Sequence, residues 1–130
     1  MGKAILCVDD EKMIIVSLVN QLREHFGDKY MYETAMSAEE ALSVIDELVD
    51  FGYNVILIIS DWLMQGMNGD EFLIEVHKKY PSTINIMLTG QANPEAITNA
   101  RENAALNAYI AKPWDRKFLM NKIDELLSNV

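Results

Sequence analysis

Residues 55–59 read Val-Ile-Leu-Ile-Ile, and this uninterrupted apolar run leads into Ser60 and Asp61. A strand with one face in water alternates apolar and polar residues, whereas a strand buried on both faces is apolar throughout. The run therefore predicts a central strand of a parallel sheet. Residues 4–8 repeat the pattern and residues 84–88 nearly do, while residues 30–35 and 108–111 are weaker strand candidates.

Segments with apolar residues at helical spacing separate these strands. The five apolar stripes comprise Ile14, Leu18, Leu22 and Phe26; Ala38, Ala41, Leu42, Ile45, Leu48 and Val49; Phe72, Leu73 and Val76; Ala96, Ile97, Ala100 and Ala104; and Phe118, Leu119, Ile123, Leu126 and Leu127. Strands that alternate with helices indicate an α/β fold, in which five parallel strands carry five helices on both faces.

Several helix starts carry their own signals. Ser37 with Glu40 forms a capping-box pattern, and Asn68 with Glu71 is a variant of it. The Asn-Pro pair at residues 93–94 is typical of an N-cap followed by a first helical residue.

The bulk composition bounds the class of protein. A chain of 130 residues fits one domain, residues 1–130, and a net charge of −9 argues against nucleic-acid binding by this domain alone. The single cysteine, Cys7, excludes an internal disulfide. We expect no signal peptide, no membrane span and a cytoplasmic location, because the first residues lead directly into a strand and no apolar stretch is long enough to cross a bilayer.

Polar residues follow four of the predicted strands. They are Asp9-Asp10-Glu11, then Asp61, then Thr89-Gly90, and finally Lys112-Pro113. In parallel α/β sheets, functional groups gather beyond the carboxyl ends of the strands, so these residues are expected to meet at one edge of the sheet.

The chemistry of this group indicates a magnesium-assisted phosphoryl site. The carboxylates of Asp9, Asp10 and Asp61 would repel one another, and a hard divalent cation relieves that repulsion. One carboxylate then stays free to attack phosphorus. Lys112 and the Thr89 hydroxyl are placed to hold the phosphoryl oxygens.

The same residues carry a resemblance to a known family. Over essentially its whole length, the chain resembles the receiver domain of two-component response regulators. The resemblance implies a flavodoxin-like sheet with strand order 2-1-3-4-5. The matching segments are Val8-Asp9-Asp10-Glu11, Asp61-Trp62-Leu63-Met64 followed by Gly69, Leu88-Thr89-Gly90, and Tyr109-Ile110-Ala111-Lys112-Pro113.

The resemblance implies roles for the acidic residues. Asp61 would be the phosphoacceptor and would also contact Mg²⁺. Asp10 would bind the ion directly, Asp9 directly or through water, and Leu63 through its backbone carbonyl. The donor would be a sensor histidine kinase or a phosphotransfer protein. The domain would be a signalling switch whose only chemistry is its own phosphotransfer and dephosphorylation, not an enzyme.

The resemblance also implies how the signal leaves the site. Thr89 would move to bond the phosphoryl oxygen, Lys112 would pair with that group, and Pro113 would follow a cis peptide bond. Tyr109 would turn inward with Thr89 and change the surface formed by the fourth helix, fifth strand and fifth helix. The output domain or partner is left unknown, and a homodimer is left open.

Two residues depart from the family pattern. Gln65 stands where members usually carry proline, four residues after the expected acceptor, so the loop there is expected to be looser. Ser60 stands where an aliphatic residue is usual, which places a polar group close to Asp61.

Three other interpretations use the same residues. A magnesium-dependent phosphohydrolase that forms an aspartyl-phosphate would need a cap domain, for which the chain has no spare length. A flavodoxin-like cofactor carrier would need a Ser/Thr/Gly-rich phosphate loop where residues 9–11 are acidic. A receiver-like domain that signals without phosphate would not need the complete set of acceptor-site residues.

Overall fold

The sheet of this protein contains five strands, all parallel, in the order β2-β1-β3-β4-β5. The structure is a computed structural model and describes residues 2–91 and 94–128. The strands are β1 (Lys3–Val8), β2 (Met31–Ala35), β3 (Asn54–Ser60), β4 (Ile84–Thr89) and β5 (Ala108–Ala111). The predicted α/β class, strand order and flavodoxin-like topology are confirmed.

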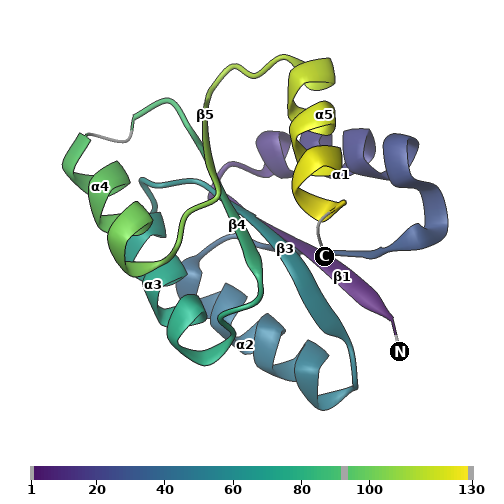
Figure 1. Ribbon diagram of the computed structural model, residues 1–130, viewed down its shortest axis with the longest axis horizontal. Coiled ribbons are helices and arrows are strands. Elements are labelled where there is room, and N and C mark those ends of the chain that lie inside the picture. The colour runs from purple at the N-terminus through teal and green to yellow at the C-terminus, as the bar shows by residue number, and fades with distance from the viewer. Residues whose placement is uncertain (1, 92–93, 129–130) are drawn as a thin grey trace.

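Helices cover both faces of this sheet (Figure 1). They are α1 (Lys12–Phe26), α2 (Ala38–Asp50), α3 (Gly69–Lys79), α4 (Pro94–Asn103) and α5 (Arg116–Leu127), with a short 3-10 turn, η1 (Gly27–Lys29), after α1. Helices α1 and α5 pack on one face, and α2, α3 and α4 on the other, with α3 between its two neighbours (Figure 1). Each helix carries the chain back to the edge where the next strand begins, so all five strands end together at the opposite edge.

Alternation along the strands divides the core into two layers. In β1, Leu6 and Val8 face the layer under α2 and α3, whereas Ile5 and Cys7 face the layer under α1 and α5. All of these side chains are buried. The apolar run needs no polar residue because neither face of β1 meets water.

The central strand contains an irregularity that the apolar run does not reveal. The register between β1 and β3 shifts between Ala4 and Ile5, so that Ile56 has no paired residue. As a result Ile56 and Leu57, although consecutive, both pack in the layer under α1 and α5. Beyond this bulge, successive side chains of β3 again point to alternate layers of the core.

Some expectations about the helices are wrong. Asn68 precedes α3, but its side chain makes no cap bond there and instead accepts a hydrogen bond from the Met64 amide at 3.4 Å. Phe118 and Val49, which were placed in apolar stripes, are 58% and 38% exposed. The stripes they extend are narrower than helical spacing alone suggests, because the sheet covers only part of each helix.

Other helix starts agree with the sequence pattern. The Ser37 hydroxyl accepts a hydrogen bond from the Glu40 amide at 3.1 Å, as a capping box requires. In a complete capping box, the Glu40 carboxylate would accept a hydrogen bond from the Ser37 amide. Here it accepts one from the Met36 amide instead. Helix α4 begins at Pro94, and Asn93, the expected N-cap, lies outside the described residues.

Candidate phosphoryl-transfer site

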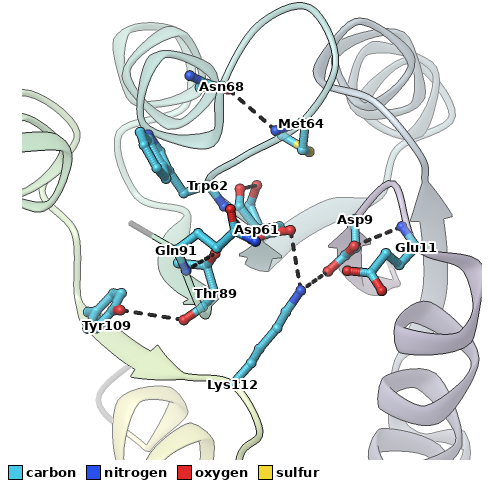
Figure 2. A network of polar contacts seen from close by, with 11 residues as sticks. Asp9, Glu11, Asp61, Trp62, Met64, Asn68, Thr89, Gln91, Tyr109 and Lys112 are labelled. Carbon is cyan, nitrogen blue, oxygen red and sulfur yellow. Dashed lines mark hydrogen bonds and ion pairs between the residues drawn. The ribbon is translucent and has the colours of Figure 1, made fainter. Parts of the chain in front are cut away.

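The predicted site residues meet where the strands end (Figure 2). A cavity of about 420 Å³ opens at this edge of the sheet, and its lining includes Asp10, Asp61, Leu63, Thr89 and Lys112. These residues follow or end β1, β3, β4 and β5, so the parallel topology alone brings them together. Asp9 lies beside the cavity and is joined to it through Lys112.

Three carboxylates converge at this edge of the sheet. One oxygen each from Asp9, Asp10 and Asp61 lie within 4.8 Å of one another. Asp9 and Asp61 are only 4% and 6% exposed, whereas Asp10 points into solvent. Hard oxygen ligands at this spacing suit Mg²⁺, which combines one or two carboxylates with water and a bound phosphate. The donor set therefore fits the ion that the sequence predicts.

Lys112 lies between the two buried carboxylates (Figure 2). Its Nζ atom is 2.6 Å from Oδ2 of Asp9 and 3.3 Å from Oδ2 of Asp61. The peptide bond between Lys112 and Pro113 is cis, the geometry that the resemblance implies. The single ammonium leaves the three acidic groups with an excess of negative charge, which a divalent cation would offset.

The pKa values of Asp9 and Lys112 are both raised, but for different reasons. Burial raises the pKa of Asp9, and the hydrogen bond and charge of Lys112 oppose that rise without overcoming it. Burial alone would lower the pKa of Lys112, but the hydrogen bond that its ammonium donates to Asp9 and the charges of Asp61 and Asp9 outweigh burial, so the pKa of Lys112 is raised. Burial raises the pKa of Asp9 more than its one ammonium neighbour lowers it, whereas Lys112 faces two carboxylates, which together outweigh its burial. Lys112 is therefore held in its charged form.

Backbone amides fix the orientation of the acidic groups. The Trp62 amide donates to Oδ1 of Asp61 at 2.8 Å, and the Glu11 amide donates to Oδ1 of Asp9 at 2.9 Å. The Asp61 amide in turn donates to the carbonyl of Val8 at 2.9 Å, which continues the β1–β3 pairing to the end of the strand. The site is thus built on the rigid sheet.

Thr89 and Tyr109 are in contact on the β4–β5 side of the site (Figure 2). Thr89 is 1% exposed, and its hydroxyl accepts a hydrogen bond from the Gln91 amide at 3.3 Å. The Tyr109 hydroxyl donates to the carbonyl of Thr89 at 3.4 Å, and that carbonyl also accepts from the Lys112 amide at 3.2 Å. Tyr109 is half-buried and packs partly against the core.

Ser60 and the loop of Gln65, the two departures from the family pattern, are each held by a hydrogen bond. The Ser60 side chain is fully buried, and its hydroxyl donates to the backbone carbonyl of Asp61 at 2.8 Å instead of to the carboxylate. Its polar group therefore supports the backbone without competing for the carboxylate. The loop that contains Gln65 is held by Glu39, which accepts a hydrogen bond from the Met67 amide at 3.3 Å.

One residue near the site carries no signal in the sequence. Asp70, in the first turn of α3, is only 8% exposed and is hydrogen-bonded to both Trp62 and Asn99. An aspartate in a first helical turn is ordinarily explained by the helix dipole, so its spacing suggests nothing further. Only the packing of three separate segments around Asp70 reveals that its carboxylate is buried and shared.

The fold and the site together define a doubly wound α/β domain with an acidic pocket at its strand ends. Among solved structures, the chain is similar to a CheY-like response regulator receiver domain protein from Methanospirillum hungatei JF-1. The two share 34% sequence identity with a TM-score of 0.82, over 99% of this chain and 96% of that one. The signal receiver domain of an HD domain-containing protein from Pseudomonas fluorescens Pf-5 is 28% identical, with a TM-score of 0.81 over 98% of this chain and 88% of that one.

Sequence comparisons agree with these structural neighbours. The model of the response regulator receiver domain matches residues 5–124, and the chain belongs to that family. A chemotaxis protein CheY homolog from Campylobacter jejuni is 28% identical over 95% of this chain and 91% of its own length. The hydrogenase transcriptional regulatory protein HoxA of Cupriavidus necator is 29% identical over 92% of this chain, but the chain spans only 23% of HoxA. It spans 12% of the sensor kinase CckA of Brucella abortus.

Membership of this family makes the domain a signalling switch of two-component systems. No helix among residues 2–91 and 94–128 combines the length and the apolar character needed to cross a bilayer.

Proposed function

We propose that the domain, residues 1–130, accepts a phosphoryl group on Asp61 from a phosphohistidine of a sensor histidine kinase or a phosphotransfer protein. One observation carries this proposal: carboxylates from the ends of β1 and β3 converge within 4.8 Å beside a lysine, at an open cavity. A carboxylate oxygen of Asp61 attacks phosphorus, the nitrogen–phosphorus bond breaks, and the imidazole leaves with the electron pair. The product is an acyl phosphate on Asp61.

Mg²⁺ is the cofactor that this donor set suits. Asp9, Asp10, Asp61 and the backbone carbonyl of Leu63 would hold it. When bound, the ion neutralises charge on the carboxylates and on the incoming phosphoryl oxygens. The solvent-facing position of Asp10 leaves the ion an entry path.

The positive and hydroxyl groups of the pocket act on the product. Lys112 pairs with Asp9 and Asp61 before transfer and with a phosphoryl oxygen afterwards, since its Nζ is already 3.3 Å from the acceptor carboxylate. The Thr89 hydroxyl lines the same cavity and gains a strong acceptor when the phosphoryl group arrives. Both groups favour the phosphorylated arrangement because each gains a phosphoryl oxygen as a partner only in that state.

Tyr109 transmits the change to the surface of α4, β5 and α5. Its hydroxyl contacts the carbonyl of Thr89, so a displacement of Thr89 alters the space and the hydrogen bond available to the ring. The output partner reads that surface. Relatives such as HoxA and CckA are longer proteins, which is consistent with a kinase donor and with outputs that differ between members. A cytoplasmic location belongs to the same proposal.

Phosphorylation by a small acyl-phosphate donor tests this function directly. Incubation with Mg²⁺ and acetyl phosphate should add one phosphate to the parent protein, and peptide mapping should place it on Asp61. Asp61→Asn should remain unmodified, whereas Asp46→Asn, a change at an exposed aspartate of α2, should be modified like the parent. A magnesium-dependent phosphate on Asp61→Asn would refute the assignment, and steady-state hydrolysis of phosphate esters would favour a phosphohydrolase.

A further inference from the structure

Asp70 joins three segments that are separate in the chain. Its Oδ1 atom accepts a hydrogen bond from the indole Nε1 of Trp62 at 3.0 Å, and its Oδ2 atom accepts one from the side-chain amide of Asn99 at 2.9 Å. Trp62 lies in the loop that follows β3, Asp70 lies in the first turn of α3, and Asn99 lies in the middle of α4. The carboxylate is thus a bridge between the acceptor loop and α4.

The bridge depends on neutral donors. Asp70 is 8% exposed, and no lysine, arginine or histidine forms an ion pair with it among the residues that the structure describes. A buried carboxylate without a cation is stable only when hydrogen bonds replace its water. Loss of either donor leaves a charged acceptor unsatisfied, so both bonds hold their segments more tightly than bonds between neutral groups would.

One end of the bridge reaches the proposed phosphoacceptor. The backbone amide of Trp62 donates to Oδ1 of Asp61 at 2.8 Å (Figure 2), while the indole of the same residue donates to Asp70. A phosphoryl group on Asp61 changes the charge and the acceptor strength of its carboxylate. The position of Trp62 therefore responds to the state of Asp61.

The other end of the bridge holds a helix with little apolar anchoring. The side chains that α4 buries are small, Ala96 and Ala100. Helix α4 lies beside α3 in the fold (Figure 1), so Asn99 is within reach of Asp70 without crossing the core. Because the apolar contact of α4 is small, one hydrogen bond to a charged group is a large share of what fixes its position.

We propose that Asp70 is a positioning residue that couples Asp61 to α4 through Trp62 and Asn99. This route is separate from the contact between Thr89 and Tyr109. It rests on the proposed function in one respect, since the signal it carries is phosphorylation of Asp61.

The hydrogen-bond route is tested first without phosphate. Trp62→Phe removes the indole N–H and keeps an aromatic ring. Hydrogen exchange followed by mass spectrometry should show that amides of residues 94–103 exchange about tenfold faster than in the parent, while those of α5 are unchanged. Unaltered exchange of α4 in Trp62→Phe overturns the proposal, and this result does not depend on whether the protein is ever phosphorylated.

The coupling is tested second with Mg²⁺ and acetyl phosphate. Asn99→Ala and Asp70→Asn should take up phosphate like the parent by intact mass, but the change in α4 exchange on phosphorylation should shrink about fivefold or more. Arg101→Gln, at an exposed residue of the same helix, should keep the full change. A purely structural role for Asp70 would alter exchange equally in both states and leave the difference intact, and a full difference in both variants overturns the proposal.

Failure of the two proposals is distinguishable. If the parent takes up no phosphate, the acceptor function fails, while the exchange of α4 in Trp62→Phe still decides whether the acceptor loop and α4 are linked. If phosphate is incorporated and the α4 response survives in Asn99→Ala and Asp70→Asn, the acceptor function stands and the route through Asp70 fails.

Discussion

A Cβ atom placed on Gly69 would lie 1.9 Å from the backbone oxygen of Asp61. It would also lie 2.9 Å from Cα of Trp62, so the first residue of α3 fits against the chain just after β3 only because it has no side chain. The Gly69 amide donates to the Trp62 carbonyl at 2.7 Å, which holds the two segments at this distance. The close approach places α3 directly over the loop that carries Asp61.

Gly69→Ala is therefore expected to be strongly destabilising. The clash is with backbone atoms, which cannot rotate away, so the free energy of unfolding should fall by about 3 kcal/mol. Urea denaturation followed by tryptophan fluorescence measures this loss. Gly90→Ala is the matched control, because its φ is not positive and the added carbon would meet no atom closer than 3.7 Å, so it should change stability by less than about 1 kcal/mol. Equal costs for the two variants would contradict the steric explanation.

Removal of the ammonium between the carboxylates should be costly in the absence of a divalent ion. In Lys112→Ala, Asp9 and Asp61 lose their shared cation, and the free energy of unfolding should fall by about 2 kcal/mol. Added Mg²⁺ should restore part of this loss, since it supplies positive charge to the same groups. Thermal unfolding with and without Mg²⁺ measures both effects. Lys79→Ala, which breaks an exposed pair with Asp46, is the control and should change stability little.

The same Lys112→Ala variant should separate magnesium binding from the change in partner affinity that phosphorylation causes. It keeps the carboxylates and should still bind Mg²⁺, but phosphorylation should shift its affinity for a partner less than in the parent. A shift as large as that of the parent would show that Lys112 is not needed for the response.

Magnesium binding should stabilise the fold through Asp10. At a concentration ten times the dissociation constant, an ion that binds only the folded state adds about 1.4 kcal/mol to the free energy of unfolding. Asp10→Asn removes an exposed ligand without disturbing the buried pair, so the rise of the unfolding midpoint with Mg²⁺ should be reduced. Glu102→Gln, at an exposed acid of α4, should retain the full rise. A full rise in Asp10→Asn would remove Asp10 from the ligand set.

Cys7 should be inert in the folded protein. Burial raises the pKa of its thiol to about 12, and the side chain is only 1% exposed. The thiolate is the reactive form, so a disulfide reagent should react with the native protein at least about a thousandfold more slowly than with the urea-unfolded chain. Since Cys7 is the single cysteine, the reaction reports that site alone. Rapid labelling without denaturant would contradict the burial.

The raised pKa of Cys7 also has a consequence for stability at alkaline pH. The unfolded thiol ionises near its ordinary pKa of 9.0, whereas the folded thiol does not. The contribution of this group is therefore fully present below that pH and is lost as the pH rises toward about 12. Cys7→Ala should lose less stability between these limits than the parent does, as measured by urea denaturation at several pH values.

Most of the fold follows from local patterns. The continuous apolar runs mark β1, β3 and β4 to within a residue or two, because only strands buried on both faces can do without polar residues. The position of the polar residues at the ends of those strands was enough to predict that Asp9, Asp61, Thr89 and Lys112 lie at one edge, since parallel strands end together. The weak strand at residues 108–111 also matches β5 as predicted.

Other features could not be predicted, because they depend on contacts between distant segments. The bulge at Ile56 leaves no mark in a run that is apolar at every position. The exposure of Phe118 depends on how far α5 is covered by its neighbours. The side chain of Asn68 bonds to the Met64 amide because the loop before α3 folds back on itself, which a capping pattern does not encode.

Periodicity alone predicted an α/β fold of five parallel strands, and the strand ends predicted the groups that gather at one edge, since both depend only on which residues avoid water and where each strand stops. The strand order was implied by the family resemblance, and the structure confirms it. The tertiary structure decided the charge balance around Lys112 and the sharing of Asp70 between Trp62 and Asn99. Hydrogen bonds and ion pairs act over about 3 Å. Whether two side chains far apart in the chain come that close is set by how helices pack on the sheet, and no local pattern records that distance.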